Sequence, residues 1–433
     1  MRRLFVTLWL GLGLAACVER GDVLGPLPAA VDTGEGEGGA EPAEMAGMGG
    51  SAPAAGSGGL AGSAVTTPTA VVAAVSLGNG HGAALSDGRI FTWGQNDHGQ
   101  LGQGDTVERH TPTLLASDLR FSALASGGDF TCALDELGAV YCWGAGDRGQ
   151  LGQGDRTEHH APVRVTLPVR ASSITSDFEH VCALLGNAQL YCWGRNQEGE
   201  LGQNDRVPPS NDDTARDALE PVEVPGDDWS FVDAGDGHTC GIRDDGSLWC
   251  WGRNTDHQLG QGDDPQVRTP LQVGTDTDWL RVDCGQQHSI ALKQDHSIWV
   301  WGLNEASNGN PPEGWPLGLD AAELDVPTEL GTATDWVAVS TRVFHSCAVN
   351  RQGELWCWGR NVEGQLGTGD TTLKKTPALV ASNVADVDVS WFTTCALERG
   401  GGLACTGKNE EGELGTGATD RPLRFTDITA AFR

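Results

Sequence analysis

One dipeptide recurs along the chain at nearly constant spacing, and it limits the folds that this sequence can adopt. Six Trp-Gly pairs stand 50 to 58 residues apart, beginning at Trp93, Trp143, Trp193, Trp251, Trp301 and Trp358. A seventh copy reads Thr406-Gly407. A repeat of about fifty residues is typical of arrays in which one unit cannot bury both of its faces alone, so that neighbouring units must stack. We therefore expect function in the loops and not in the repeated core.

Each copy contains two short apolar runs joined by a tight turn. In the second copy, residues 131–134 are followed by turn residues 135–138 and by a second run at 139–144. Placing Cys132 opposite Cys142 sets the register of an antiparallel hairpin whose side chains alternate between two faces. A further apolar run precedes each hairpin, and another strand-like run follows it. About four strands in each of seven copies predict an all-β, seven-bladed β-propeller over residues 67–433.

Ten of the twelve cysteines occupy facing positions in five hairpins: Cys132 and Cys142, Cys182 and Cys192, Cys240 and Cys250, Cys347 and Cys357, and Cys395 and Cys405. In the fifth copy both are replaced together, by Ile290 and Val300. Replacement in pairs favours disulfides, since facing antiparallel residues have Cα atoms about 4.5 to 5.5 Å apart. Reduced, packed cysteines and a zinc site are the alternatives, although each hairpin offers only two sulfurs. Five disulfides indicate an oxidising compartment, and Cys284 is expected to be a buried free thiol.

The first sixteen residues have the layout of a secretion signal. Arg2 and Arg3 precede an apolar run from Leu4 to Leu14, which is too short to span a membrane permanently, and small residues precede Cys17. This stretch resembles the lipobox of bacterial lipoproteins, in which the signal is removed and the next cysteine is lipidated. We expect residues 1–16 to be a signal peptide and Cys17 to carry a lipid anchor such as palmitate. An ordinary secretory signal is the alternative.

Composition separates the start of the chain from the repeats. Residues 17–66 are rich in Gly, Ala, Ser, Pro and acidic residues and contain no aromatic side chain. Such a segment cannot bury a core and predicts a disordered tether. The whole chain has 59 acidic and 28 basic residues, a formal net charge of −31. We expect no nucleic-acid partner, because that affinity comes largely from basic side chains that neutralise phosphates. The charge fits either a well-solvated surface or a site for cationic ligands.

Two further motifs accompany the Trp-Gly pair. Residues 96–105 read Asn-Asp-His-Gly-Gln-Leu-Gly-Gln-Gly-Asp, and similar segments follow other Trp-Gly pairs. A Gly-x-x-His element precedes the hairpin, as at residues 235–238 and 285–288. Together these motifs resemble the regulator-of-chromosome-condensation repeat family over residues 70–433. The resemblance implies a seven-bladed propeller that serves as a protein-binding platform, as in a eukaryotic nucleotide-exchange factor and a secreted bacterial inhibitor of β-lactamases. It names no target for this chain.

No motif indicates catalysis or a cofactor. The chain lacks H-E-x-x-H and G-x-S-x-G, and its glycine-rich loops match neither a P-loop nor an EF-hand. We expect no enzymatic activity, no cofactor and no metal ion. The glycines are expected to form tight turns closed by Asp. Five repeated histidines are expected to bond backbone within their own blades, because symmetry separates equivalent positions: His81, His180, His238, His288 and His345.

Departures from the repeat are the best guide to a binding site, because function on a symmetric scaffold gathers where loops lengthen. The third copy is extended over residues 207–228, and the fifth is rewritten over residues 305–329. Both changes fall in the same segment of the repeat and should project from one face. Trp315 is either an exposed anchor for a partner or packed back on its blade. The candidate partner-binding residues are Asp212, Asp213, Arg216, Asp217, Trp315, Asp320 and Glu323.

These patterns predict a monomeric, non-catalytic scaffold or inhibitor-like module that binds another protein. We expect it outside the cytoplasm, lipid-anchored at the outer membrane or cell surface in preference to the inner membrane. A carbohydrate-binding or cell-wall-remodelling protein is the alternative, since 15 tryptophans could stack on sugar rings. Closure of the ring stays open, because residues 70–76 and 425–432 both resemble the same strand.

Overall fold

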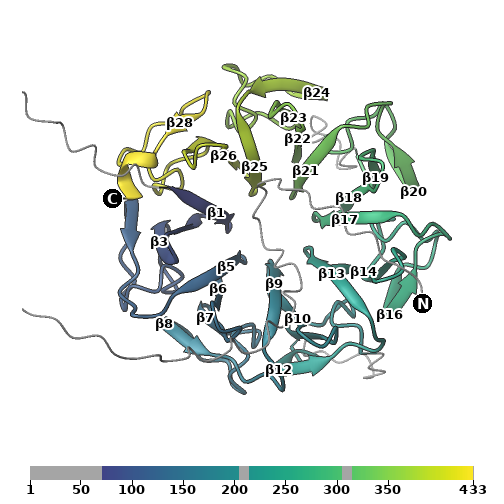
Figure 1. Ribbon diagram of the computed structural model, residues 1–433, viewed down its shortest axis with the longest axis horizontal. Coiled ribbons are helices and arrows are strands. Elements are labelled where there is room, and N and C mark those ends of the chain that lie inside the picture. Colours follow the sequence, from purple (N-terminus) through teal and green to yellow (C-terminus); the bar gives the residue numbers. More distant parts are fainter. Residues whose placement is uncertain (1–70, 204–213, 305–314, 433) are drawn as a thin grey trace, which may run out of the picture. The chain divides into compact units, whose positions relative to one another are not determined.

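The computed structural model describes residues 71–203, 214–304 and 315–432. Within these ranges, 28 strands form seven separate four-stranded antiparallel sheets. Figure 1 shows them as seven blades around a ring, with the first strand of each blade innermost and the fourth at the rim. The predicted all-β, seven-bladed propeller is confirmed. The predicted signal peptide, Cys17 and tether lie outside the described residues.

The blades follow one another in sequence, each from its innermost to its outermost strand. Blades 1 to 3 comprise β1 (Val72–Leu77), β2 (His81–Ser86), β3 (Arg89–Gly94), β4 (Arg109–Leu114); β5 (Phe121–Ser126), β6 (Phe130–Asp135), β7 (Val140–Gly144), β8 (His159–Arg164); and β9 (Ala171–Asp177), β10 (His180–Leu185), β11 (Leu190–Gly194), β12 (Ala218–Glu223). Blades 4 and 5 comprise β13 (Trp229–Ala234), β14 (His238–Arg243), β15 (Leu248–Arg253), β16 (Gln266–Gln272); and β17 (Trp279–Cys284), β18 (His288–Lys293), β19 (Ile298–Leu303), β20 (Glu323–Glu329). Blades 6 and 7 comprise β21 (Trp336–Thr341), β22 (His345–Asn350), β23 (Leu355–Gly359), β24 (Lys374–Ala381); and β25 (Val384–Val389), β26 (Thr393–Glu398), β27 (Leu403–Gly407), β28 (Thr426–Asp427).

The hairpin register follows the sequence prediction. In blade 2, Ala133 lies opposite Tyr141 and Leu134 opposite Val140, and the other blades repeat this pattern. All five predicted disulfides are present with Cα atoms 4.1 Å apart: Cys132 with Cys142, Cys182 with Cys192, Cys240 with Cys250, Cys347 with Cys357, and Cys395 with Cys405. Each joins the second and third strands of one blade, so the disulfides brace single hairpins and do not link blades. Cys284 is buried and free, as expected.

The ring closes without a blade that mixes the two ends of the chain. β1 belongs to blade 1, and β28 belongs to blade 7. The carboxylate of Asp388 on β25 accepts the Leu77 backbone N–H at 2.7 Å, which joins the innermost strands of blades 7 and 1. A 3-10 helix, η1 (Thr429–Phe432), follows β28, and the Phe432 ring lies 5.3 Å from that of Phe91. No helix in the described part of the chain is long and apolar enough to cross a membrane.

Neighbouring blades are held together by a shared carbonyl oxygen. In blade 2, the indole Nε1 of Trp143 and the hydroxyl of Thr131 both donate to the Gln100 carbonyl of blade 1, at 2.9 Å. The indole contact recurs from Trp93, Trp193, Trp251, Trp301 and Trp358. Gly102, with φ +71°, leaves room for the ring, because a Cβ there would lie 2.7 Å from the Trp143 Nε1 atom. The repeated Gln-Leu-Gly segment therefore accepts the tryptophan of the next blade.

The repeated histidines extend this contact. His81 Nε2 lies 3.0 Å from the Thr131 hydroxyl of the next blade. Because that hydroxyl gives its proton to a carbonyl, the imidazole donates to the hydroxyl oxygen. His180, His238 and His345 make the same bond to the next blade, and His288 bonds there to the hydroxyl of Thr341 on β21. The prediction that these rings bond backbone in their own blades was wrong, because burial places each ring against the neighbouring blade.

The polar contact is lost where both of its partners change. At the interface of blades 2 and 3, Phe130 replaces the histidine and Val181 replaces the threonine, and both are fully buried.

In blade 7, Thr406 replaces the tryptophan and donates instead to the Gly364 carbonyl at 3.0 Å. A Cβ on Gly367 would lie 2.5 Å from the Phe425 ring, so Phe425 fills the space that an indole occupies in other blades.

The buried histidines make stability depend on pH. Burial lowers the pKa of His345 to about 3, from about 6.5 in an unfolded chain. Above pH 6.5 the ring is neutral in both states; between pH 6.5 and 3 only the unfolded chain takes up the proton, so stability falls. The variant His345→Gln can still donate to Thr394 but has no imidazole to protonate. We expect its free energy of unfolding to rise by about 2 kcal/mol relative to that of wild type when the pH is lowered from 7.5 to 5. Urea unfolding at both pH values measures this; a constant difference would contradict it.

The carboxylate of Asp388 is one of the groups that join blade 7 to blade 1. We expect Asp388→Ala to cost about 1 to 3 kcal/mol, because the Leu77 N–H would be buried without a partner. Asp388→Asn keeps an acceptor oxygen and serves as the matched control. Chemical denaturation gives the free energies, and hydrogen exchange at Leu77 should rise in the alanine variant alone. Equal losses in both variants would show that this bond does not close the ring.

Candidate functional site

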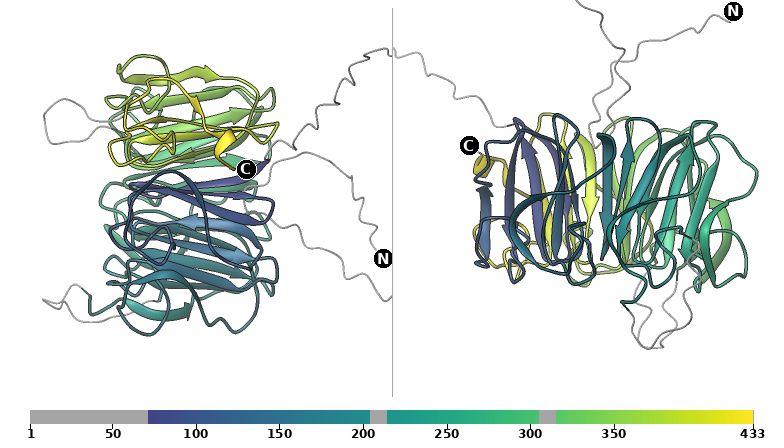
Figure 2. Two further views of the ribbon diagram at one scale, coloured as in Figure 1. Left: turned by 90° about the vertical axis from the view of Figure 1, so that its left-hand side faces the viewer. Right: turned by 90° about the horizontal axis from the view of Figure 1, so that it is seen from below.

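The strand order gives the ring two different faces. We call the face with the connections from first to second strands and from third to fourth strands the loop face. The opposite face, with the turns between second and third strands and the links between blades, is the turn face. Figure 2 shows the strands running across the ring between these two faces. Residues 204–213 and 305–314 lie outside the described chain, but the strands that flank them end at the loop face.

A small polar cavity of about 110 Å³ lies at the centre of the ring, lined by the innermost strands of all seven blades. Three of its carboxylates, Asp233, Asp283 and Asp388, stand at equivalent strand positions. Each accepts a backbone N–H from the next blade, at 2.7 to 2.8 Å. Burial raises the pKa of Asp233 to about 6 and that of Asp388 to about 7. These acids therefore join the blades, and no three of them are close enough to hold a metal ion within the described residues.

An ion pair crosses the ring above this cavity. Arg342 follows β21 in blade 6, and its guanidinium contacts the carboxylate of Asp177 at the end of β9 in blade 3. Both replace the glycine that begins the Gly-x-x-His element in other blades. Burial raises the pKa of Asp177 to about 7, although the charge of Arg342 opposes that shift.

Aromatic side chains cover the same region of the loop face. The Phe178 ring of blade 3 stacks on that of Trp391 in blade 7, with centroids 6.2 Å apart. Phe344 of blade 6 stacks on Phe392 of blade 7 at 5.6 Å, and Trp391 meets Phe392 edge-on. The Arg360 guanidinium lies 4.6 Å from the Phe344 ring centre. All four rings are half-buried, so they present one continuous apolar surface at the centre of the loop face. We call Phe178, Phe344, Trp391 and Phe392 the aromatic cluster.

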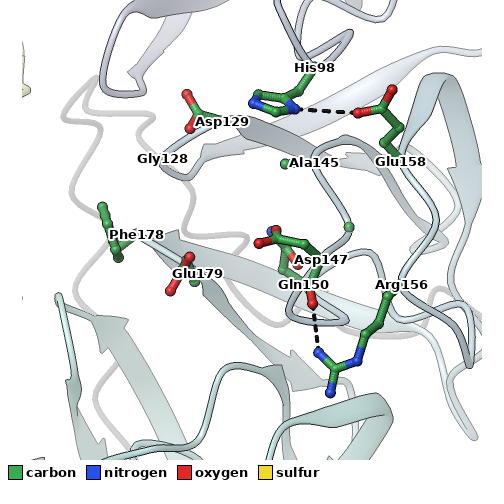
Figure 3. A pocket seen from close by; sticks show the side chains of 11 residues that line it. His98, Gly128, Asp129, Ala145, Asp147, Gln150, Arg156, Glu158, Phe178 and Glu179 are labelled. Carbon is green, nitrogen blue, oxygen red and sulfur yellow. Dashed lines mark hydrogen bonds and ion pairs between the residues drawn. The ribbon is translucent and has the colours of Figure 1, made fainter. Parts of the chain in front are cut away.

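A pocket of about 280 Å³ adjoins the aromatic cluster, with Phe178 in its wall. It lies where blades 2 and 3 meet and where the histidine contact is absent. Figure 3 shows His98 and Arg156 on its rim, and carboxylates facing it from several loops: Asp129, Asp147, Glu158 and Glu179. His98 Nδ1 contacts Glu158 at 3.3 Å, and Arg156 donates to the Asp147 carbonyl at 2.6 Å.

Asp129 is the unusual acid of this pocket. Its carboxylate is half-buried and makes no ion pair or hydrogen bond with any described residue. Burial raises its pKa, and the negative charges of Asp147 and Asp97 add to that shift, while His98 opposes it. A cation placed beside Asp129 would relieve both effects. The pocket therefore suits a lysine or arginine side chain presented next to an apolar surface.

The candidate partner-binding residues predicted in the third copy do not form one exposed surface among the described residues. Asp212 and Asp213 lie outside the described residues. The Asp217 side chain is fully buried and pairs with Arg156 at 3.0 Å, so it braces the loop and is not exposed. Arg216 is half-buried and donates to the Gln197 carbonyl at 3.3 Å.

Of the candidate partner-binding residues from the fifth copy, one is buried and two are exposed. Trp315 is only 6% exposed, with the Lys375 ammonium 3.6 Å from its ring centre, so of the two alternatives for this side chain the structure has the one packed back on its blade. Its ring packs back because the apolar indole is shielded there by the blade and the lysine. Asp320 and Glu323 are exposed, and Glu323 contacts His257 at 3.3 Å. They belong to blade 5, on the same face as the pocket.

Sequence reasoning missed the aromatic cluster, although a signal was present. In three copies the Gly-x-x-His element has lost its first glycine: residues 177–180 read Asp-Phe-Glu-His, 342–345 read Arg-Val-Phe-His, and 390–393 read Ser-Trp-Phe-Thr. Substitutions without a change of length are less visible than insertions. These three segments contribute the ion pair and all four clustered rings.

One further group of potential metal ligands occurs in the described chain. His238, Cys240 and Cys284 bring ligand atoms within 4.8 Å of one another. Cys240 is bonded to Cys250, so its sulfur is not a thiolate. Burial also raises the pKa of the Cys284 thiol, which keeps it protonated.

Comparison with known proteins places the fold in a family. The family model of the RCC1-like domain matches residues 46–335, and models of the regulator of chromosome condensation (RCC1) repeat match residues 337–365 and 352–397. The crystal structure of human WBSCR16 is 20% identical, with a TM-score of 0.67 over 78% of this chain and 93% of that chain. Yeast RCC1 (Prp20), solved bound to Kap60, is 21% identical, with a TM-score of 0.63 over 74% of this chain and 78% of that chain.

Curated relatives match over shorter stretches. The human E3 ubiquitin-protein ligase HERC2 is 29% identical over 151 residues, which are 35% of this chain and 2% of the length of HERC2. The ultraviolet-B receptor UVR8 of Arabidopsis thaliana is 36% identical over 77 residues, 17% of this chain and 18% of the receptor. With the repeated Trp-Gly motif, the seven four-stranded blades and a family model that matches more than half of its length, the chain belongs to the RCC1-like domain family.

Proposed function

We propose that this chain is a lipid-anchored, extracytoplasmic propeller that binds another protein through its loop face and performs no catalysis. The observation that carries the proposal is the aromatic cluster, four half-buried rings beside a pocket in which Asp129 pairs with none of the described residues. Interface hot spots combine aromatic anchors with a polar surround. The anchor rests on Cys17 and the preceding signal-like segment.

The partner that fits this face is a protein segment with basic and apolar side chains. Apolar groups would cover Phe178 and Trp391, while a lysine or arginine would enter the pocket beside Asp129. The exposed acids Asp320 and Glu323 would extend the contact along the same face. Family members offer a parallel, since yeast RCC1 (Prp20) was solved bound to Kap60, and its binding to Gsp1p and histones has been described.

Carbohydrate binding is less well supported by the tryptophans. Of the 14 in the described residues, ten are buried and four half-buried, and most hold blades together or pack inside them. Sugar platforms need an open ring face. Trp391, the one tryptophan of the aromatic cluster, already stacks on Phe178.

Substitution on the loop face tests the proposal. We expect the double variant Phe178→Ser with Trp391→Ser, and separately Asp129→Lys, to lose at least tenfold in affinity for the partner that the wild-type protein captures from solubilised envelopes. The first removes apolar contact area, and the second places a positive charge where a cation should bind. Leu271→Ser, at an exposed position on the outer strand of blade 4, is the matched control.

Thermal unfolding of each variant separates loss of the site from loss of the fold. Asp129 has no partner in the described chain, so its substitution should leave the melting temperature close to that of wild type. If all variants capture the same protein with unchanged affinity, binding does not use this face. If neither the wild-type protein nor the Leu271→Ser control captures a protein, protein binding itself is contradicted.

A further inference from the structure

A groove separate from the two cavities described above lies on the turn face, at blade 2. It has a volume of about 600 Å³ and lies between the β6–β7 turn and the link from β8 to β9. Its apolar lining includes Leu137 and Val169, which are 66% and 41% exposed, together with half-buried Leu119, Leu167 and Tyr141. Arg164 and Arg170 flank these side chains. We call this hollow the blade 2 groove.

The groove breaks the symmetry of the ring at the tip of the turn. The position of Leu137 is taken in the other blades with a turn of equal length by polar residues or glycine: Asn187, Asp245, Asp295, Gln352 and Gly400. An apolar side chain exposed at such a tip is costly to leave in water and has no role in holding the blade together.

The groove also carries positive side chains at positions where most other blades have acidic or neutral ones. The residue before the innermost strand is an arginine in blades 2 and 3, Arg120 and Arg170, but an aspartate in blades 4, 5 and 6: Asp228, Asp278 and Asp335. Arg164 lies opposite Tyr141 in the register of blade 2, whereas Glu223 lies opposite Tyr191 in blade 3. A chain with a net charge of −31 therefore places Arg164 and Arg170 at positions where most of the other blades carry acids or neutral residues.

Neither arginine is used within the fold. Among the described residues, the guanidinium groups of Arg164 and Arg170 make no ion pair or hydrogen bond, and the Tyr141 hydroxyl makes none either. In blade 3 the Tyr191 hydroxyl lies 3.5 Å from the Glu223 carboxylate. In blade 2 the corresponding hydroxyl lacks such a carboxylate, so an acceptor can come from outside the chain.

We propose that the blade 2 groove binds a protein segment in which apolar side chains alternate with carboxylates. The apolar side chains would cover Leu137 and Val169, and the carboxylates would accept from Arg164, Arg170 and Tyr141. Arginine pairs with carboxylates through two parallel bonds, which gives such a site orientation as well as charge selectivity. The groove is at the opposite ends of the strands from the aromatic cluster and prefers the opposite charge, so it does not rest on the proposed function of the loop face.

A pair of designed peptides tests the groove. The probe is a fluorescent twelve-residue peptide of alternating Leu and Glu, and its counterpart replaces every Glu with Lys. We expect the Glu peptide to bind with a Kd below about 100 µM, corresponding to at least about 5 kcal/mol. The double variant Arg164→Glu with Arg170→Glu should weaken binding at least tenfold, and so should Leu137→Asp. Arg120→Glu, on the same face but already paired with Asp87, should not.

Hydrogen exchange locates the contact, with protection expected at residues 137–141 and 164–170. The loop-face variant Phe178→Ser with Trp391→Ser should bind the Glu peptide normally, so that failure of one site is distinguished from failure of the other. Absence of saturable binding up to 1 mM, equal binding of the Lys peptide, or unchanged binding by the double arginine variant would each overturn the proposal.

Discussion

The structure depends on one hydrogen bond that crosses from each blade to the one before it. An indole N–H donates to a loop carbonyl at six of the seven interfaces, and the Thr406 hydroxyl donates at the other. A blade is a four-stranded sheet with two faces to bury, so it is stable only between neighbours. The indole supplies both a large apolar surface and a donor whose acceptor lies in the preceding blade. The disulfides brace hairpins within blades, but this bond assembles the blades into a ring.

Much of the fold was predictable because it is dictated by residues that repeat. The Trp-Gly spacing gave the number of blades, and facing cysteines gave the hairpin register and the disulfides. The histidine contact was misjudged, since periodicity places a residue in its blade but does not reveal which blade its side chain meets. Closure of the ring could not be predicted either, because the two terminal segments look alike, and their places are distinguished only by the pairing of β1 with β2 and of β28 with β27.

The candidate site was harder to predict than the fold for a physical reason. The aromatic cluster and the pocket are assembled from blades that are remote in sequence, with Phe178, Phe344 and Trp391 contributed by blades 3, 6 and 7. Each is a single substitution in an element of constant length. Length changes attracted attention instead, yet Asp217 and Trp315 proved to be buried supports. In a propeller, a side chain that replaces a small residue near the axis meets side chains from across the ring.

Photocrosslinking in intact cells shows whether a partner protein sits on the aromatic cluster. A photoreactive phenylalanine analogue at Phe344 and another at Val326, on the outer strand of blade 5, would be compared in intact cells. We expect a discrete crosslinked species of increased mass from position 344 and none from position 326. Crosslinks from position 326 alone, or none from position 344 under conditions in which the protein is folded and abundant, would contradict it.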